Sequence, residues 1–292
     1  MKHNKHTLIL FISLFLFSAF RSDMPAYQLY NQKGKHTNFK KLVKEAAKAD
    51  VIFFGELHNN PIAHWLQLEL TAALHKIHQE NLILGAEMIE TDNQEALELY
   101  LNSKIEHDSL KNIARLWGNY KTDYKPLVDF AKENQLKFIG TNVPRRYASM
   151  VFRGGFEVLD TLHETDKRWI APLPIAYDPT LPAYQEMMEM MGGMIDHSSE
   201  NFPKAQAIKD ATMAWQIVEN WQKGQVFIHY NGSFHSDDYE GIVWYLNQLK
   251  PEATILTITT IETSELQRRL EEDQRFVADF TIAVPENMTK TY

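Results

Sequence analysis

The sequence predicts an α/β fold: a mostly parallel central sheet flanked by helices, with a helical cap insertion. Three observations predict it. Short apolar runs rich in β-branched and aromatic residues recur along the chain, as in strands that are buried on both faces. Longer helical patterns lie between these runs, and such alternation is typical of right-handed parallel units. One stretch, about 160–222, breaks the alternation and carries two long helical patterns, which predicts the cap.

Four apolar runs, each followed by glycine or polar residues, form the predicted centre of the sheet. They are 51–54, 82–84, 136–139 and 226–228. Two later runs, 253–260 and 276–284, are expected to extend the sheet at one edge, and 27–30 predicts a small N-terminal hairpin. The helical patterns outside the cap cover 61–78, 92–101, 126–134, 144–152 and 239–249.

The predicted cap contains two long helical patterns, 183–195 and 202–221. The first is rich in methionine, at Met187, Met188, Met190, Met191 and Met194. These adaptable side chains could simply fill the core, or they could form a soft apolar lid over a flat ligand. We expect residues 23–292 to form one domain, with this cap as its insertion.

Composition excludes several classes of function. The chain has 292 residues, 38 of them acidic and 30 basic, and a formal net charge of -8. That field opposes non-specific binding to nucleic-acid phosphates, so we expect no nucleic-acid partner. The chain has no cysteine, which rules out disulfides, thiolate nucleophiles and a lipid-modified N-terminal cysteine. The available chemistry is therefore that of His, carboxylates, Tyr, Arg and Ser.

The N-terminal segment predicts export. Lys2 and Lys5 precede an apolar run, 8–17, that ends at small residues. This order is typical of a secretory signal peptide over 1–22, although an uncleaved N-terminal anchor is the alternative. We expect the protein in the periplasm or at the outer-membrane periphery, without lipidation.

Polar residues follow the predicted central strands. In doubly wound sheets, ligands bind outside the carboxyl ends of the strands, so these residues are expected to meet at one edge. The candidate site residues are Glu56, His58, Glu87, Asn142, Arg145, Arg146, Tyr147 and His235. Two further residues are less clear: His64 is expected on the solvent face of its helix, and Asp210 could point towards the site or cap a packing contact.

Two kinds of chemistry suit this set. A divalent metal that activates water could be bound by His58 and His235 with Glu56 or Glu87. Without a metal, His58 could act as a general base that is oriented by Glu56 or Glu87. The other kind is haem binding. Tyrosinate is one of the protein ligands of ferric haem, which points to Tyr147, one turn into a helix. The neighbouring guanidinium groups, Arg145 and Arg146, suit the haem propionates.

Several stretches together resemble one known family. They are 51–58 (Val-Ile-Phe-Phe-Gly-Glu-Leu-His) with Asn60-Pro61, 85–88, 117–120 leading to 124–127, 142–145, 209–213 and 231–235. Over about 50–241 the chain resembles the ChaN-like haem-binding proteins, which are related to the Tiki and TraB group and to erythromycin esterases. The resemblance implies an α/β core with a helical cap, bacterial export, and iron acquisition through haem. It also implies a homodimer that encloses two haems, and contact with outer-membrane haem-uptake machinery.

Carried over to this sequence, the resemblance gives two functional hypotheses. The first is an exported haem-binding protein in which Tyr147 binds the iron, Arg145 and Arg146 bind the propionates, and cap methionines and aromatics cover the haem faces. The strand-end residues Glu56, His58, Glu87, Asn142 and His235 then surround it. Other tyrosines that could replace Tyr147 are Tyr120, Tyr124, Tyr177 and Tyr184. The alternative is a metal-dependent or His-based hydrolase that uses His58, Glu56, Glu87 and His235.

Overall fold

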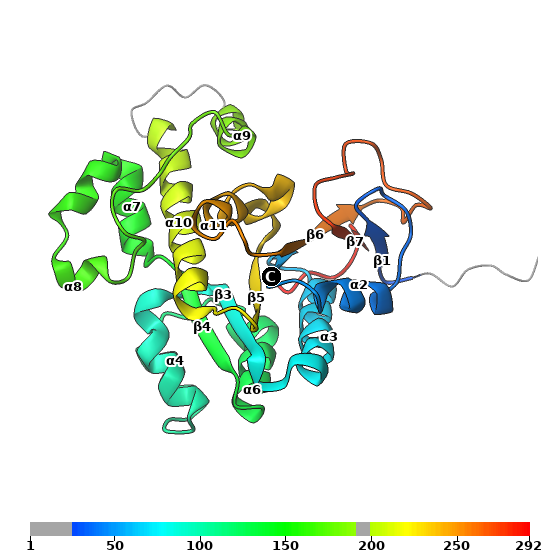
Figure 1. Cartoon of the computed structure of the whole chain (residues 1–292), viewed down its shortest axis with the longest axis horizontal. Coiled ribbons are helices and arrows are strands. Elements are labelled where there is room, and N and C mark those ends of the chain that lie inside the picture. Colours follow the sequence, from blue (N-terminus) through cyan, green and yellow to red (C-terminus); the bar gives the residue numbers. More distant parts are fainter. Residues whose placement is uncertain (1–24, 191–198) are drawn as a thin grey trace, which may run out of the picture.

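One seven-stranded sheet organises the computed structural model of the chain (Figure 1), which describes residues 25–190 and 199–292. The strand order is β1-β7-β6-β2-β5-β3-β4, and every neighbouring pair is parallel except β1 with β7. This architecture confirms the predicted fold class. The expected signal segment 1–22 and the cap residues Met191 and Met194 lie outside the described residues.

The strands continue beyond the apolar runs that predict them. They are β1 (Gln28–Asn31), β2 (Val51–Glu56), β3 (Leu82–Glu90), β4 (Lys137–Asn142), β5 (Val226–Gly232), β6 (Ile255–Thr263) and β7 (Phe280–Pro285). Backbone pairing persists from Val51 to Glu56 against β5, and as far as Asn142 in β4. Glu56, Glu87 and Asn142 therefore lie within strands and not after them. An apolar run predicts only the part of a strand whose side chains pack against apolar helices, so the strand can continue beyond the run.

The N-terminal strand differs from the expected hairpin. β1 pairs antiparallel with β7 at the edge of the sheet, and an isolated antiparallel bridge joins Tyr30 to His36 just beyond it. The main partner of this strand is therefore the last strand of the chain and not the segment that follows it. The later runs do extend the sheet on that side, because β6 pairs with β2 and β7 with β6.

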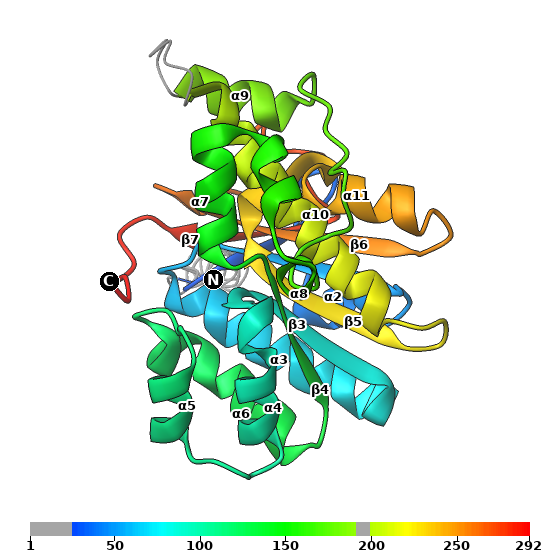
Figure 2. The ribbon, with the colours of Figure 1, turned by 90° about the vertical axis from the view of Figure 1, so that its left-hand side faces the viewer.

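Helices cover both faces of the sheet (Figure 2). On one face lie α2 (Phe39–Ala46), α3 (Pro61–His78), α4 (Gln94–Leu101), α5 (His107–Ile113) and α6 (Lys125–Glu133). On the other face lie α7 (Arg145–Gly154), α10 (Phe202–Asn220) and α11 (Ile242–Leu249). Successive strand residues alternate between the two cores: Val51 and Phe53 pack with α10, and Ile52 and Phe54 pack with α3. None of the helices in the described parts of the chain is both long and apolar enough to span a membrane.

The predicted cap stretch contains α8 (Glu164–Lys167), α9 (Pro182–Met190) and α10. Of these, α10 packs directly on the sheet, since Met213 and Ile217 belong to the same core as Phe227. The methionine-rich helix α9 contacts α10 from outside, and Met187 is buried against Tyr184. Met187 therefore fills a core, which is one of the two roles considered for these methionines.

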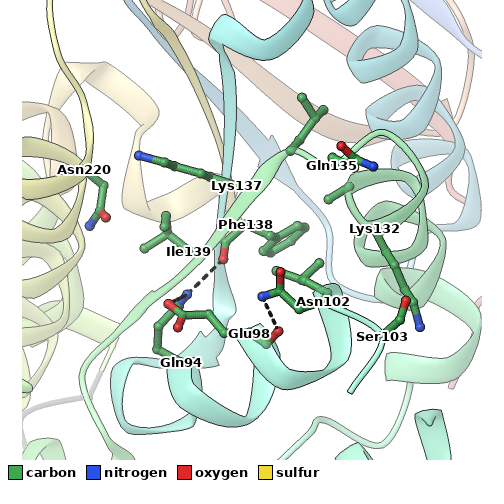
Figure 3. Close-up of a pocket in the computed structure, with 13 residues that line it drawn as sticks. Gln94, Glu98, Asn102, Ser103, Lys132, Gln135, Lys137, Phe138, Ile139 and Asn220 are labelled. Atoms are coloured by element: carbon green, nitrogen blue, oxygen red, sulfur yellow. Dashed lines mark hydrogen bonds between the residues drawn. The ribbon is translucent and has the colours of Figure 1, made fainter. Parts of the chain in front are cut away.

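A groove of about 650 Å³ runs along the outer edge of β4 (Figure 3). Gln94 covers this edge: its Nε2 donates to the carbonyl of Phe138 at 3.2 Å, and its Oε1 accepts from the N–H of Gly140 at 2.7 Å. The amide thus occupies positions that an added strand would use. Among the described residues that line the groove there is no histidine, and we place the functional site elsewhere.

The start of α3 gives a stability prediction. Asn60 is fully buried, and its side-chain oxygen accepts from the N–H groups of Ile62 at 3.0 Å and Ala63 at 3.2 Å. Asn60→Ala should lower the free energy of unfolding by about 1 kcal/mol, because it removes the N-cap. Asn60→Ser should restore most of the loss. Urea denaturation of the three proteins measures this, and equal stability of Asn60→Ala and wild type would contradict it.

Candidate functional site

The first half of the site is a buried carboxylate at the end of β2. Glu56 is 1% exposed, and its Oε1 accepts from His58 Nδ1 at 2.9 Å and from the Tyr124 hydroxyl at 2.7 Å. Its Oε2 accepts from Gln67 Nε2 at 2.5 Å and lies 3.3 Å from His64 Nδ1. Burial alone would raise the pKa of Glu56, but the hydrogen bonds from His58 and His64 outweigh it and lower the pKa to about 2. Glu56 is therefore a carboxylate at neutral pH.

Two elements on one face of the sheet bring these partners together. α3 carries His64 and Gln67, and a π-helical turn, Tyr120–Tyr124, carries Tyr124. Just before this turn, Asn119 Nδ2 donates to the carbonyl of His58 at 3.0 Å. Short π-helical segments are rare and are often found at functional sites. The expectation that His64 faces solvent is wrong, because it lies between Glu56 and Asp123 and is 6% exposed.

The second half of the site lies on the opposite face of the sheet. His235, 5% exposed, has Nδ1 2.5 Å from Asp210 Oδ1 and Nε2 3.2 Å from Glu87 Oε1. Glu87 Oε2 also accepts from the backbone N–H of Gly232 at 2.8 Å. The side chain of Gln206 lies within 3.1 Å of the same ring. Asp210 thus points towards the site, which was one of the two roles considered for it.

These charges stabilise one another. Burial would lower the pKa of His235, but the carboxylates of Glu87 and Asp210 raise it to about 10. Burial would raise the pKa of Glu87, whereas the His235 charge lowers it below its usual range. For Asp210 burial is the larger effect and raises the pKa, while His235 partly offsets it. At neutral pH, His235 is therefore an imidazolium held between two buried acidic groups.

His58 lies between the two halves. Its Nδ1 is fixed by Glu56, and its Nε2 faces Gly232, where an added Cβ would lie 2.7 Å from that nitrogen and 3.6 Å from Glu87 Oε2. Its side chain is 32% exposed, more than that of His64 or His235. Trp117 packs edge-on against the ring, with the two centroids 4.9 Å apart. Although burial would lower the pKa of His58, the hydrogen bond to Glu56 and the charge of Glu87 raise it.

A pocket of about 870 Å³ opens beside His58. Its walls come from the end of β3, the segment before α6, the start of α7 and the C-terminal segment, and they include Glu90, Arg115, Trp117, Asn119, Arg145 and Tyr292. Trp117 and Asn119 both contact His58, so the pocket adjoins the first half of the site, although His58 is not one of the residues that line it. Arg115 is paired with Glu90 and Asp92, whereas Arg145 is exposed and forms no ion pair with any described residue. The pocket therefore combines an aromatic wall with an available guanidinium group.

The predicted residues of α7 fall into two groups. Arg145 lines this pocket. Arg146 pairs with Asp92 and donates to the Tyr147 hydroxyl at 2.9 Å, and Tyr147 is 2% exposed in the core beneath α7. Neither residue lines the pocket beside His58. Asn142 is 9% exposed, and its Oδ1 is buried without a hydrogen-bond partner among the described residues.

The donor geometry does not fit the divalent metal expected in the hydrolase hypothesis. Among the described residues, no three His, Asp or Glu side chains are grouped so that they could hold an ion. Both nitrogens of His235 lie beside carboxylates, Nδ1 beside Asp210 and Nε2 beside Glu87.

Sequence patterns did not predict three polar residues that support Glu56, His235 and His58. Gln67, Gln206 and Asn119 reach the site from helices and from a loop before a π-helical turn. For Gln67 the signal is a polar residue on the same face of α3 as Leu66, Leu70 and Leu74, and its side chain is fully buried. Tyr124 was considered only as a haem ligand, but its hydroxyl donates to Glu56.

The fold and site define a class: an α/β protein whose parallel strands end in paired imidazole and carboxylate groups beside an open pocket. A family model described as "Haem-binding uptake, Tiki superfamily, ChaN" matches residues 42–246. The chain belongs to this family, which confirms the resemblance noted in the sequence. No curated protein matches the chain.

Solved structures share the fold. One, described as cofacial heme binding to ChaN of Campylobacter jejuni, is 18% identical, with a TM-score of 0.67 over 88% of this chain and 96% of that one. The erythromycin esterase EreC in its open conformation is 11% identical, with a TM-score of 0.47 over 89% and 83% of the two chains. The first similarity establishes a common fold, and the second is too low to support an argument.

Gly232 gives the first prediction for the site. A methyl group at this position would meet His58 Nε2 at 2.7 Å, so Gly232→Ala should displace the imidazole from Glu56. The pKa of His58 should then fall, because the hydrogen bond that His58 donates to Glu56 raises it. NMR titration of the His58 ring protons measures this. A variant that titrates like the wild type would show that the ring is not confined at Gly232.

His235 gives the second prediction. Because folding raises its pKa from 6.5 to about 10, its contribution to stability is complete below pH 6.5 and is lost as the pH rises to about 10. The wild-type free energy of unfolding should fall across that window. The His235→Gln variant should lose most of this pH dependence. Near pH 6.5 its free energy of unfolding should be lower than that of the wild type by about 3–5 kcal/mol, because one partner of a buried ion pair has been removed.

Chemical denaturation between pH 6 and 10 measures this dependence. His163→Gln, at an exposed histidine, is the matched control and should follow the wild type. A His235→Gln variant whose stability keeps the wild-type slope would contradict the assignment of the proton to His235.

Proposed function

We propose that the protein binds haem in the pocket beside His58. The observation that carries the proposal is the pocket itself: it has about 870 Å³ of space, within the range of small-molecule and cofactor sites, and it is lined by Trp117 and the unpaired Arg145. An indole offers a flat apolar wall to a porphyrin, and a guanidinium is suited to a propionate carboxylate. The donor set therefore fits haem, and membership of a haem-binding family supports the same ligand.

Each predicted residue has a role in this proposal. Arg145 binds a propionate directly. Arg146 contributes indirectly, because its guanidinium group is already paired with Asp92 and hydrogen-bonded to Tyr147. Glu56 holds His58 beside the pocket, and Glu87, paired with His235, lies on the other side of that ring near Gly232. Asn142, with its unpartnered Oδ1, lies at the end of β4, beside the start of α7.

The identity of the iron ligand stays a prediction. Tyr147 was the expected ligand, and its hydroxyl would have to leave Arg146 and the core beneath α7 to reach the pocket. Among the other tyrosines considered, Tyr124 donates to Glu56, Tyr184 donates to Asp210, and the hydroxyl of Tyr120 is buried. Each of these would give up a buried position on binding.

We also propose the cellular role that the sequence predicts. The protein is exported by the segment 1–22 to the periplasm or the outer-membrane periphery, and delivers haem for iron acquisition together with outer-membrane uptake machinery. It forms a homodimer on haem binding. Size-exclusion chromatography with light scattering of the free and haem-loaded protein tests the dimer, and an unchanged monomer mass on loading would refute it.

A haemin titration followed by absorbance tests the proposal. Wild type should give a saturable Soret change. Arg145→Ala should bind about 10- to 100-fold more weakly, as expected when a hydrogen bond to a charged group worth about 1.5–3 kcal/mol is lost. Arg153→Ala, at an exposed arginine on the last turn of the same helix, is the matched control and should bind like the wild type. If the wild type shows no saturable change, haem is not its ligand.

One observation favours a second function, a His-based hydrolase without a metal. His58 is half-buried, lies beside the pocket and is oriented by Glu56 through Nδ1, as a general base requires. Hydrolysis of p-nitrophenyl esters that His58→Gln and Glu56→Gln both abolish would establish this activity. Equal rates for wild type and His58→Gln would eliminate it.

A further inference from the structure

Asp123 is a buried acid on the π-helical turn Tyr120–Tyr124, with an exposed fraction of 4%. Its Oδ2 accepts from Asn119 Nδ2 at 2.7 Å and lies 3.4 Å from His64 Nε2. The backbone reinforces the first of these contacts, because the N–H of Asp123 donates to the carbonyl of Asn119 at 3.0 Å. Asp123 and Asn119 are therefore joined through both their backbones and their side chains.

The two donors that meet Asp123 also meet the backbone of His58. Asn119 Nδ2 donates to the His58 carbonyl at 3.0 Å, and His64 Nε2 lies 3.2 Å from the same oxygen. The two hydrogens of the Asn119 amide can serve one oxygen each, whereas the single Nε2–H of His64 is shared between them. Each donor thus bridges the Asp123 carboxylate and the His58 carbonyl. The position of the carboxylate thereby determines where both nitrogens meet the His58 backbone.

His64 connects the same carboxylate to Glu56. Its Nδ1 lies 3.3 Å from Glu56 Oε2, so both ring nitrogens lie beside acceptor oxygens. Such surroundings favour the imidazolium, in which both nitrogens are donors. Burial would lower the pKa of His64, but the hydrogen bond to Glu56 and the charges of Glu56 and Asp123 raise it. Asp123 therefore also acts, through His64, on the carboxylate that orients the His58 ring.

The same segment of chain forms part of the pocket beside His58. Trp117 and Asn119, just before the turn, line this pocket, and the Trp117 ring packs against His58. At the end of the turn, the Tyr124 hydroxyl donates to Glu56 at 2.7 Å. One segment thus contacts the carboxylate, the backbone of the histidine and the space in which a ligand would bind.

We propose that Asp123 is a positioning residue, which holds His58 in a fixed place relative to the pocket wall. It acts through Asn119 and His64, and it does not itself line the pocket. The inference deepens the proposed haem-binding function and rests on it for the role of the pocket. The decisive group is the acceptor oxygen that orients Asn119. An asparagine at position 123 would keep that oxygen and lose the charge, whereas an alanine would lose both.

The test compares full-length Asp123→Asn, Asp123→Ala and Asn119→Ala with the wild type. NMR measures the pKa of His64 and the signal of the His58 Nδ1–H that is hydrogen-bonded to Glu56. Asp123→Asn should lower the pKa of His64 and keep the His58 signal. Asp123→Ala and Asn119→Ala should lose that signal by exchange with water, because the ring is no longer held against Glu56. Both should bind haemin on the order of tenfold more weakly, about 1.4 kcal/mol.

The matched control is Asp273→Ala, at an exposed acid, which should behave like the wild type in both measurements. An Asp123→Ala variant with an intact His58 signal and wild-type affinity would show that this acid has no positioning role. If circular dichroism shows that Asp123→Ala does not fold, Asn119→Ala decides the question in the same way, since Asn119 is only partly buried.

Two further outcomes are distinguished by the same measurements. A His58 signal that is lost equally in Asp123→Asn would assign the effect to the charge and overturn the role of the acceptor oxygen. If the wild type does not bind haemin, the proposed function fails, and the His58 signal still decides whether Asp123 positions the ring.

Discussion

The hydrogen bond between Glu56 and His58 is the interaction on which the site depends. It joins Glu56, the last residue of β2, to the segment that follows this strand. It thereby holds the imidazole at the edge of the sheet, which separates the two hydrophobic cores. Because side chains alternate along a strand, Glu56 is buried with α3 while Glu87 is buried with α10. His58 therefore responds to both carboxylates and lies beside the pocket.

Keeping carboxylates inside a protein is costly unless each is paired, and here each has several partners. Glu56 is surrounded by two imidazoles, an amide and a phenol. Glu87 shares the charge of His235 with Asp210, and the backbone of Gly232 completes its coordination. A buried ion pair often stabilises a protein no more than apolar packing of similar volume, so we attribute the value of this arrangement to the fixed position that it gives to His58.

The sequence predicted the sheet and its polar edge but not the two-sided arrangement of the site. Uninterrupted apolar runs such as 51–54 and 226–228 predicted the central strands, because buried parallel strands are apolar on both faces. The strand residues Glu56, Glu87 and Asn142 were placed after the strands, since hydropathy cannot distinguish a polar residue inside a buried strand from one in a loop. Gln67, His64 and Gln206 were missed or misplaced because helix periodicity shows which face is apolar and not which polar residue on it meets a charge. The position of the C-terminal segment depends on long-range contacts such as Thr291 with Asn59, which no local pattern encodes.

A crystal structure of the haemin-loaded full-length protein tests the central claim most directly. The account predicts the porphyrin in the pocket lined by Trp117 and Arg145, with the neighbouring His58 still hydrogen-bonded to Glu56. Haem bound elsewhere, for example in the separate pocket of about 550 Å³ lined by Tyr177 and Met188, would contradict it.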